Sequence, residues 1–134
     1  MVKRGVALGF LGRFGRSQDL RYLDAALLQS HLQPSYIPEG VKMAAVSLMS
    51  EGRPEPGAHE YPPVGALIAL CAFGLEEFTE HNGAEAGAQT LARLLRALEE
   101  GEGLDASIVL LMLHAKLLHR SLKDEYGIEA DEAG

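Results

Sequence analysis

Residues 105–122 read DASIVLLMLHAKLLHRSL, which is the most apolar run in the chain. Asp105 can accept a hydrogen bond from the first free N–H groups of a helix. The Leu, Met, Ala, Lys and Arg residues that follow are good helix formers. Apolar side chains fall on most sides of such a helix, as is typical of a helix at the centre of a domain. His114 and Lys116 interrupt the run too early for a membrane span. We therefore expect 105–122 to be the central buried helix.

Four amphipathic helices are expected around this central one, because apolar residues recur at helical spacing in four further segments. These segments are 17–32, 38–52, 63–81 and 84–100. Gly65 and Gly74 interrupt the third segment; each can permit the close approach of a neighbouring helix, and Gly74 can instead divide the segment in two. The pattern predicts an all-α domain, a compact orthogonal bundle of about five helices.

The 134 residues and the 47% hydrophobic content predict one globular domain. We divide the chain into a basic, glycine-rich leader (1–16), a helical body (17–128) and an acidic tail (129–134). A single cysteine, Cys71, excludes an internal disulfide framework and fits a reducing compartment such as the cytoplasm. Cys71 lies on an apolar helix face, where a small buried side chain is the ordinary interpretation.

Charge is strongly segregated along the chain. Residues 1–16 carry four basic residues and no acidic one, whereas residues 17–134 carry the other 8 basic and all 19 acidic residues. The body should therefore repel nucleic acid and anionic membranes, and only the leader could attract them. The apolar residues of the leader are expected to dock on the body, and its repeated glycines disfavour a helix there. Reversible contact with an anionic membrane is the alternative.

Two clusters are candidate sites. Arg13 and Arg16, beside the free N–H groups expected after Ser17, could hold an anion or a partner. A metal set is also conceivable, because His and carboxylate side chains four apart share a helix face. Its candidate ligands are Glu77, Glu80, His81 and His59. A solvated acidic helix end is the ordinary interpretation of this second cluster.

Two further histidines receive structural interpretations. His114 is expected to be a core residue bonded to a backbone carbonyl, and His119 to belong to a basic helix C-terminus. We see no GxSxG, HExxH or CxxC motif, and no cofactor is implied. The favoured hypothesis is a non-enzymatic helical module that binds another protein, or a second copy of itself as a homodimer. The alternatives are membrane-surface association through 1–16 and a metal- or small-ligand-binding helical domain.

Overall fold

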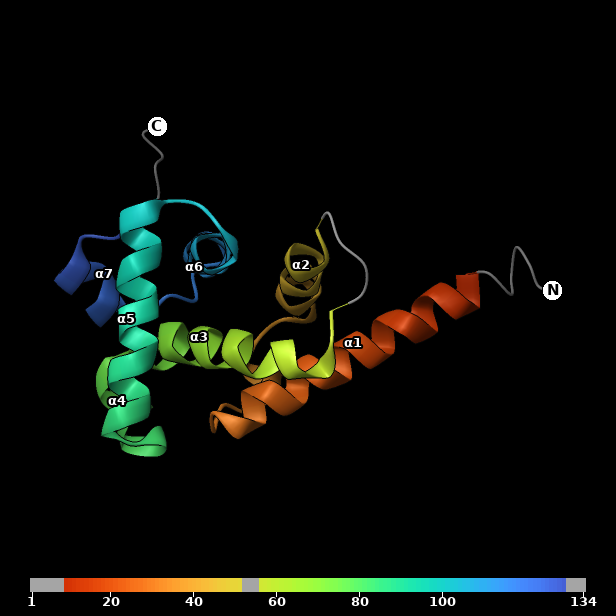
Figure 1. The fold of residues 1–134 in the computed structure, drawn as a ribbon, viewed down its shortest axis with the longest axis horizontal. Coiled ribbons are helices and arrows are strands. Elements are labelled where there is room, and N and C mark those ends of the chain that lie inside the picture. Colours follow the sequence, from red (N-terminus) through yellow and green to blue (C-terminus); the bar gives the residue numbers. More distant parts are fainter. Residues whose placement is uncertain (1–8, 52–55, 130–134) are drawn as a thin grey trace.

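The protein is built from helices throughout the part of the chain that is described. The computed structural model describes the backbone of residues 9–51 and 56–129, and the side chains of 18–51 and 56–129. These residues contain no strand, which confirms the all-α prediction (Figure 1). The elements in chain order are α1 (Gly9–Gln29), η2 (Pro34–Tyr36), α2 (Glu39–Ser50), η3 (Ala58–Glu60), α3 (Tyr61–Phe73), α4 (Leu75–Asn82), α5 (Ala84–Glu100), α6 (Leu104–His114) and α7 (Arg120–Tyr126).

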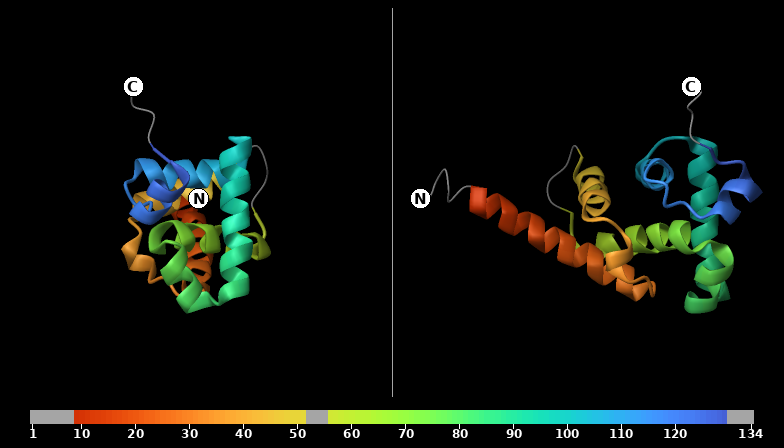
Figure 2. Two further views of the ribbon diagram at one scale, coloured as in Figure 1. Left: turned by 90° about the vertical axis from the view of Figure 1, so that its left-hand side faces the viewer. Right: turned by 180° about the vertical axis from the view of Figure 1, so that it is seen from behind.

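Helix α3 lies at the centre of the bundle, in place of the predicted segment 105–122. Eight of its 13 residues are buried, which leaves it without a broad solvent-facing side. It packs against α1, α4, α5 and α6, and α5 crosses its C-terminal end while α1 runs beneath it (Figures 1 and 2). Pro62 and Pro63 suit the first turn of α3, where their missing N–H groups would have no helical acceptor.

The predicted helix 105–122 is wrong as a single element. It divides into α6 and α7 because Lys116 adopts a left-handed conformation with φ of 64°. Lys116 N–H donates to the Leu113 carbonyl and Leu117 N–H to the Met112 carbonyl, a pair of bonds that ends α6 in a Schellman motif. The prediction of about five helices becomes seven in the described residues, because Gly74 also separates α3 from α4.

Helix α1 is longer at its start than the sequence indicates. Its backbone is helical from Gly9, so the expected helix start at Ser17 is wrong and half of the leader belongs to α1. At its other end, His31 has φ of 70° and Leu32 N–H donates to the Leu27 carbonyl, a second Schellman motif formed without glycine. The first turns of α1 extend past α2, away from the rest of the bundle (Figures 1 and 2).

Two ion pairs fix helices to one another at the rim of the core. Arg93 on α5 donates to both carboxylate oxygens of Asp105, at 3.1 and 2.9 Å, and to the Pro63 carbonyl at 2.9 Å. Asp105 therefore lies in the first turn of α6 and pairs with α5, whereas the N-cap position belongs to Gly103. Lys42 on α2 pairs with Asp24 on α1 at 2.9 Å.

The α1–α3 crossing is closed by Gly65. A Cβ added to Gly65 would lie 2.7 Å from both the carbonyl carbon and the Cβ of Ala26, so the two helix backbones are in direct contact. This confirms the prediction that Gly65 permits the close approach of a neighbouring helix. No flexible side chain intervenes, so a larger residue can be accommodated only if a helix moves.

We expect Gly65→Ala to lower the free energy of unfolding by about 1–3 kcal/mol, because overpacking forces the α1 and α3 backbones apart. Gly40→Ala is the matched control, since nothing lies within 4 Å of an added Cβ there and alanine should stabilise α2 by about 0.5 kcal/mol. Urea unfolding followed by circular dichroism measures both. Equal stability of the Gly65→Ala and wild-type proteins would contradict the crossing.

Candidate functional site

A groove of about 790 Å³ lies between α4 and α7. Its residues come from two segments that are about 40 positions apart in the sequence. Its lining is Leu75, Glu76, Glu77, Thr79, Glu80, His119, Ser121, Leu122, Glu125 and Tyr126. The groove exists because the chain turns at Gly74 and again before Arg120, so that both short helices leave from one corner of the bundle.

That corner is held by close backbone contacts. His119 N–H donates to the Cys71 carbonyl at 2.7 Å, which ties the start of α7 to the last turn of α3. Gly74 has φ of 83° and ψ of 164°, and a Cβ there would lie 2.8 Å from His119 Nδ1 and 2.9 Å from Ser121 Oγ. His119 caps α7, with Nδ1 accepting from Ser121 N–H at 3.1 Å. His119 thus stands at a helix N-terminus, so its predicted place at a basic C-terminus is wrong.

The floor of the groove is apolar and its rim is acidic. Leu122 is 2% exposed, and Leu75 and Tyr126 are partly buried beside it. The rim carries four carboxylates from the lining residues listed above, three on α4 and one on α7. Only Glu77 among them makes an ion pair within the described residues, with His81 at 3.7 Å. The groove therefore concentrates negative charge above an apolar surface.

The Gly74 break also changes the electrostatic setting of these carboxylates. In an unbroken helix 63–81, one of the two alternatives that the sequence leaves open, Glu77 would lie near the C-terminus, where a carboxylate is mildly unfavourable. In the structure Glu76 and Glu77 lie in the first turn of α4, where the helix dipole stabilises negative charge.

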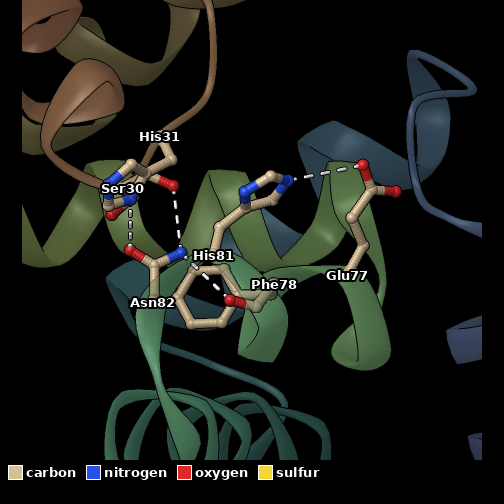
Figure 3. Close-up of polar contacts among 6 residues, drawn as sticks. All are labelled: Ser30, His31, Glu77, Phe78, His81 and Asn82. Atoms are coloured by element: carbon tan, nitrogen blue, oxygen red, sulfur yellow. Dashed lines mark hydrogen bonds and ion pairs between the residues drawn. The ribbon is translucent and has the colours of Figure 1, made fainter.

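Figure 3 shows the other side of α4, where its C-terminus is joined to the end of α1. Asn82 Nδ2 donates to the Ser30 carbonyl at 3.0 Å and to the Phe78 carbonyl at 3.1 Å, and Asn82 Oδ1 lies 3.1 Å from His31 Nδ1. The His81 ring stacks near His31, with centroids 6.1 Å apart. His81 therefore contributes to the α1–α4 junction and does not line the groove.

The predicted metal set is not assembled. His59 lies in η3, before α3, whereas Glu77, Glu80 and His81 lie in α4, after α3. A 13-residue helix spans about 20 Å, so His59 is remote from the other three. Among residues 18–51 and 56–129, whose side chains are described, no group of three or more His, Cys, Asp or Glu side chains is placed to hold a metal ion.

The predicted anion site at the start of α1 also changes. Ser17 lies well inside α1, so the backbone N–H groups that follow it belong to the helix interior and are not free. The side chains of Arg13, Arg16 and Ser17 lie outside the described residues. Whether these two arginines contact a partner stays a prediction.

Two other sequence interpretations have clear outcomes. Cys71 is fully buried, as expected, and burial raises the pKa of its thiol from the ordinary 9.0 to about 12. His114, by contrast, is exposed at the last turn of α6, so its predicted place in the core is wrong.

Sequence reasoning found the α4 wall of the groove but missed its α7 wall. The spacing of Glu77 and Glu80 makes them site candidates. Nothing in the sequence singles out Leu122, Glu125 or Tyr126, because the pattern of 105–122 predicts one continuous helix. No sequence pattern indicates that Gly74 and Ser121 are neighbours, because only the fold brings them together.

A comparison of the chain with protein-family models, with curated proteins and with solved structures gives no match. In the described part of the chain, the helices are too short or too polar for any of them to cross a membrane.

We expect the Cys71 thiol to stay unreactive toward a disulfide reagent at pH 8 until urea unfolds the chain.

The pKa of the Cys71 thiol is near 9.0 in the unfolded chain and about 12 in the folded one. The unfolded state therefore binds fewer protons than the folded state between pH 9.0 and pH 12. Stability is therefore lost as the pH rises through this window. At pH 10 the loss should be about 1.4 kcal/mol larger for the wild type than for Cys71→Ala. Identical alkaline titrations of the two proteins would contradict this.

We expect Gly74→Ala to be more destabilising than Gly83→Ala. Both glycines have positive φ, 83° and 99°, with extended ψ, a region that costs other residues about 1–3 kcal/mol. Only at Gly74 does an added Cβ also collide with the His119 ring, since nothing lies within 4 Å at Gly83. Thermal unfolding of the two variants measures the difference, and equal losses would show that the α4–α7 corner is not tightly held.

Proposed function

We propose that this chain is a helical protein-interaction module that binds a basic, amphipathic segment in the groove between α4 and α7. The observation that carries the proposal is the combination of an apolar floor with an acidic rim at one place. Lys and Arg side chains lay their carbon stems along apolar surface and keep their charged ends in water. A segment with Leu or Phe on one face and cations on its flanks therefore complements both parts of the groove.

The charges of the groove favour this class of partner over others. Glu76, Glu80 and Glu125 have no ion-pair partner among the described residues, so their carboxylates are free to accept cations from outside. The acidic surface opposes nucleic acid and anionic lipid, which carry the same sign of charge. Each exposed pair should contribute roughly 0.2–1 kcal/mol, so several together with the apolar floor are needed for useful affinity.

We also propose a cytoplasmic location. The buried thiol of Cys71 is kept without a disulfide partner in the described residues, as is usual in a reducing compartment.

Neutralising the groove tests the interaction function directly. The groove-neutral variant replaces Glu76, Glu80 and Glu125 by Gln. The matched turn-neutral variant replaces three exposed carboxylates at the α5–α6 turn by Gln: Glu99, Glu100 and Glu102. Each variant changes the net charge from −7 by the same three units, to −4, so a difference between them reports position and not overall charge.

We expect the groove-neutral variant to bind a fluorescent Lys/Leu amphipathic helical peptide about tenfold more weakly than the wild type, which corresponds to about 0.5 kcal/mol for each lost charge. The turn-neutral variant should bind within about twofold of the wild type. Fluorescence anisotropy measures these affinities, and raising NaCl from about 50 to about 500 mM should weaken wild-type binding. Equal loss in both variants, or no binding by the wild type, would refute the proposal.

A further inference from the structure

We infer that the segment bound in the α4–α7 groove is the basic leader, residues 1–16, of a second copy of this chain. This inference rests on the proposed function and specifies which segment binds in the groove. The leader carries four cations and no acid. They are Lys3, Arg4, Arg13 and Arg16. Its apolar residues include Val6, Leu8, Phe10, Leu11 and Phe14. The chain thus contains, in one segment, the two chemistries that the groove complements: cations for its rim and apolar side chains for its floor.

A chain cannot fill its own groove with its own leader. Helix α1 spans 21 residues, or about 30 Å, and its C-terminal half is fixed to α3 at Gly65 and to α4 through Asn82. Its first turns point away from α4 and α7, which lie at the opposite end of the molecule (Figure 1). Even fully extended, eight residues before Gly9 would reach at most about 28 Å, which is less than the length of α1. The leader must therefore meet the groove of another molecule.

The positions of leader and groove favour a reciprocal pair. The first turns of α1, which contain leader residues 9–16, lie at the opposite end of the long axis from α4 and α7 (Figure 2). Two copies placed side by side and antiparallel therefore bring the start of each α1 to the other's groove. Such an arrangement closes as a two-fold dimer in which the same contact is made twice. The body carries 19 acidic and 8 basic residues outside the leader, so two bodies repel each other, and the leader–groove contacts supply the attraction.

The test uses full-length variants whose charges are matched. The leader-neutral variant replaces all four leader cations by Gln. The body-neutral control replaces four cations of the body that lie outside α4 and α7 by Gln: Arg21, Arg53, Arg96 and Lys116. Both variants have a net charge of −11, four units below the −7 of the wild type, so general repulsion between copies increases equally in the two.

We expect the wild type to sediment as a dimer, with twice the 14.4 kDa of one chain. The dimer dissociation constant should rise about tenfold or more in the leader-neutral variant relative to the body-neutral control. The dimer dissociation constant of the groove-neutral variant should exceed that of the turn-neutral variant by a similar factor. Mixing the leader-neutral and groove-neutral variants, one of them labelled with ¹⁵N, should restore a one-to-one complex in native mass spectrometry, because one intact leader then meets one intact groove.

Three outcomes would overturn the inference. They are a wild type that stays monomeric across the concentration series, a leader-neutral variant that dimerises like its control, and a mixture that forms no complex. If the wild type is monomeric but binds phosphatidylserine vesicles through the leader cations, the leader is a membrane element and the inference fails. If the wild type is monomeric but binds the Lys/Leu peptide in the groove, the proposed function is supported. The inference that the partner is the leader of a second copy is then refuted.

Discussion

The contact between Gly65 and Ala26 is the constraint on which the arrangement of the bundle depends. Backbone meets backbone there, so α1 crosses α3 without an intervening layer of side chains. Because α1 is held so closely, Leu23 and Leu27 reach the core with no exposure, and the end of α1 meets the end of α4 at Asn82. A larger side chain at position 65 would tilt α1, and the α1–α4 junction would move with it. The direction of the first turns of α1 is thus set by a residue near the centre of the fold.

Two turns that contain no glycine determine the rest of the topology. His31 and Lys116 both adopt positive φ and end α1 and α6 by Schellman motifs. In each turn the next residue is a leucine, Leu32 or Leu117, and Leu32 is 2% exposed. Burial of an apolar residue just after the left-handed position commonly accompanies this motif. The apolar contact, together with the two hydrogen bonds, offsets a backbone strain that glycine would avoid. The α7 wall of the groove follows from the turn at Lys116.

The sequence predicts helical segments well where glycine or proline marks their ends, and poorly where tertiary contacts do. Segment 84–100 coincides with α5, because Gly83 and Gly101 both have positive φ. The pattern of segment 105–122 predicts one continuous helix, because Lys116 is a good helix former and nothing local disfavours a helix there. Its break is stabilised by the His119–Cys71 hydrogen bond, a contact across about 50 positions that no local pattern reveals. For the same reason, Glu77 and Glu80 could be found as site candidates while Glu125 and Tyr126 could not.

The groove carries three carboxylates that have no ion-pair partner among the described residues. Glu76 and Glu80 are four residues apart on α4, and like charges at this spacing destabilise a helix by about 0.2–0.5 kcal/mol. Glu125 adds a third carboxylate from α7 without an ion pair among the described residues. Elsewhere on the same bundle Asp24 and Asp105 each have a basic partner. In the proposed complex, cations from a second molecule would lie between these carboxylates and turn their mutual repulsion into attraction.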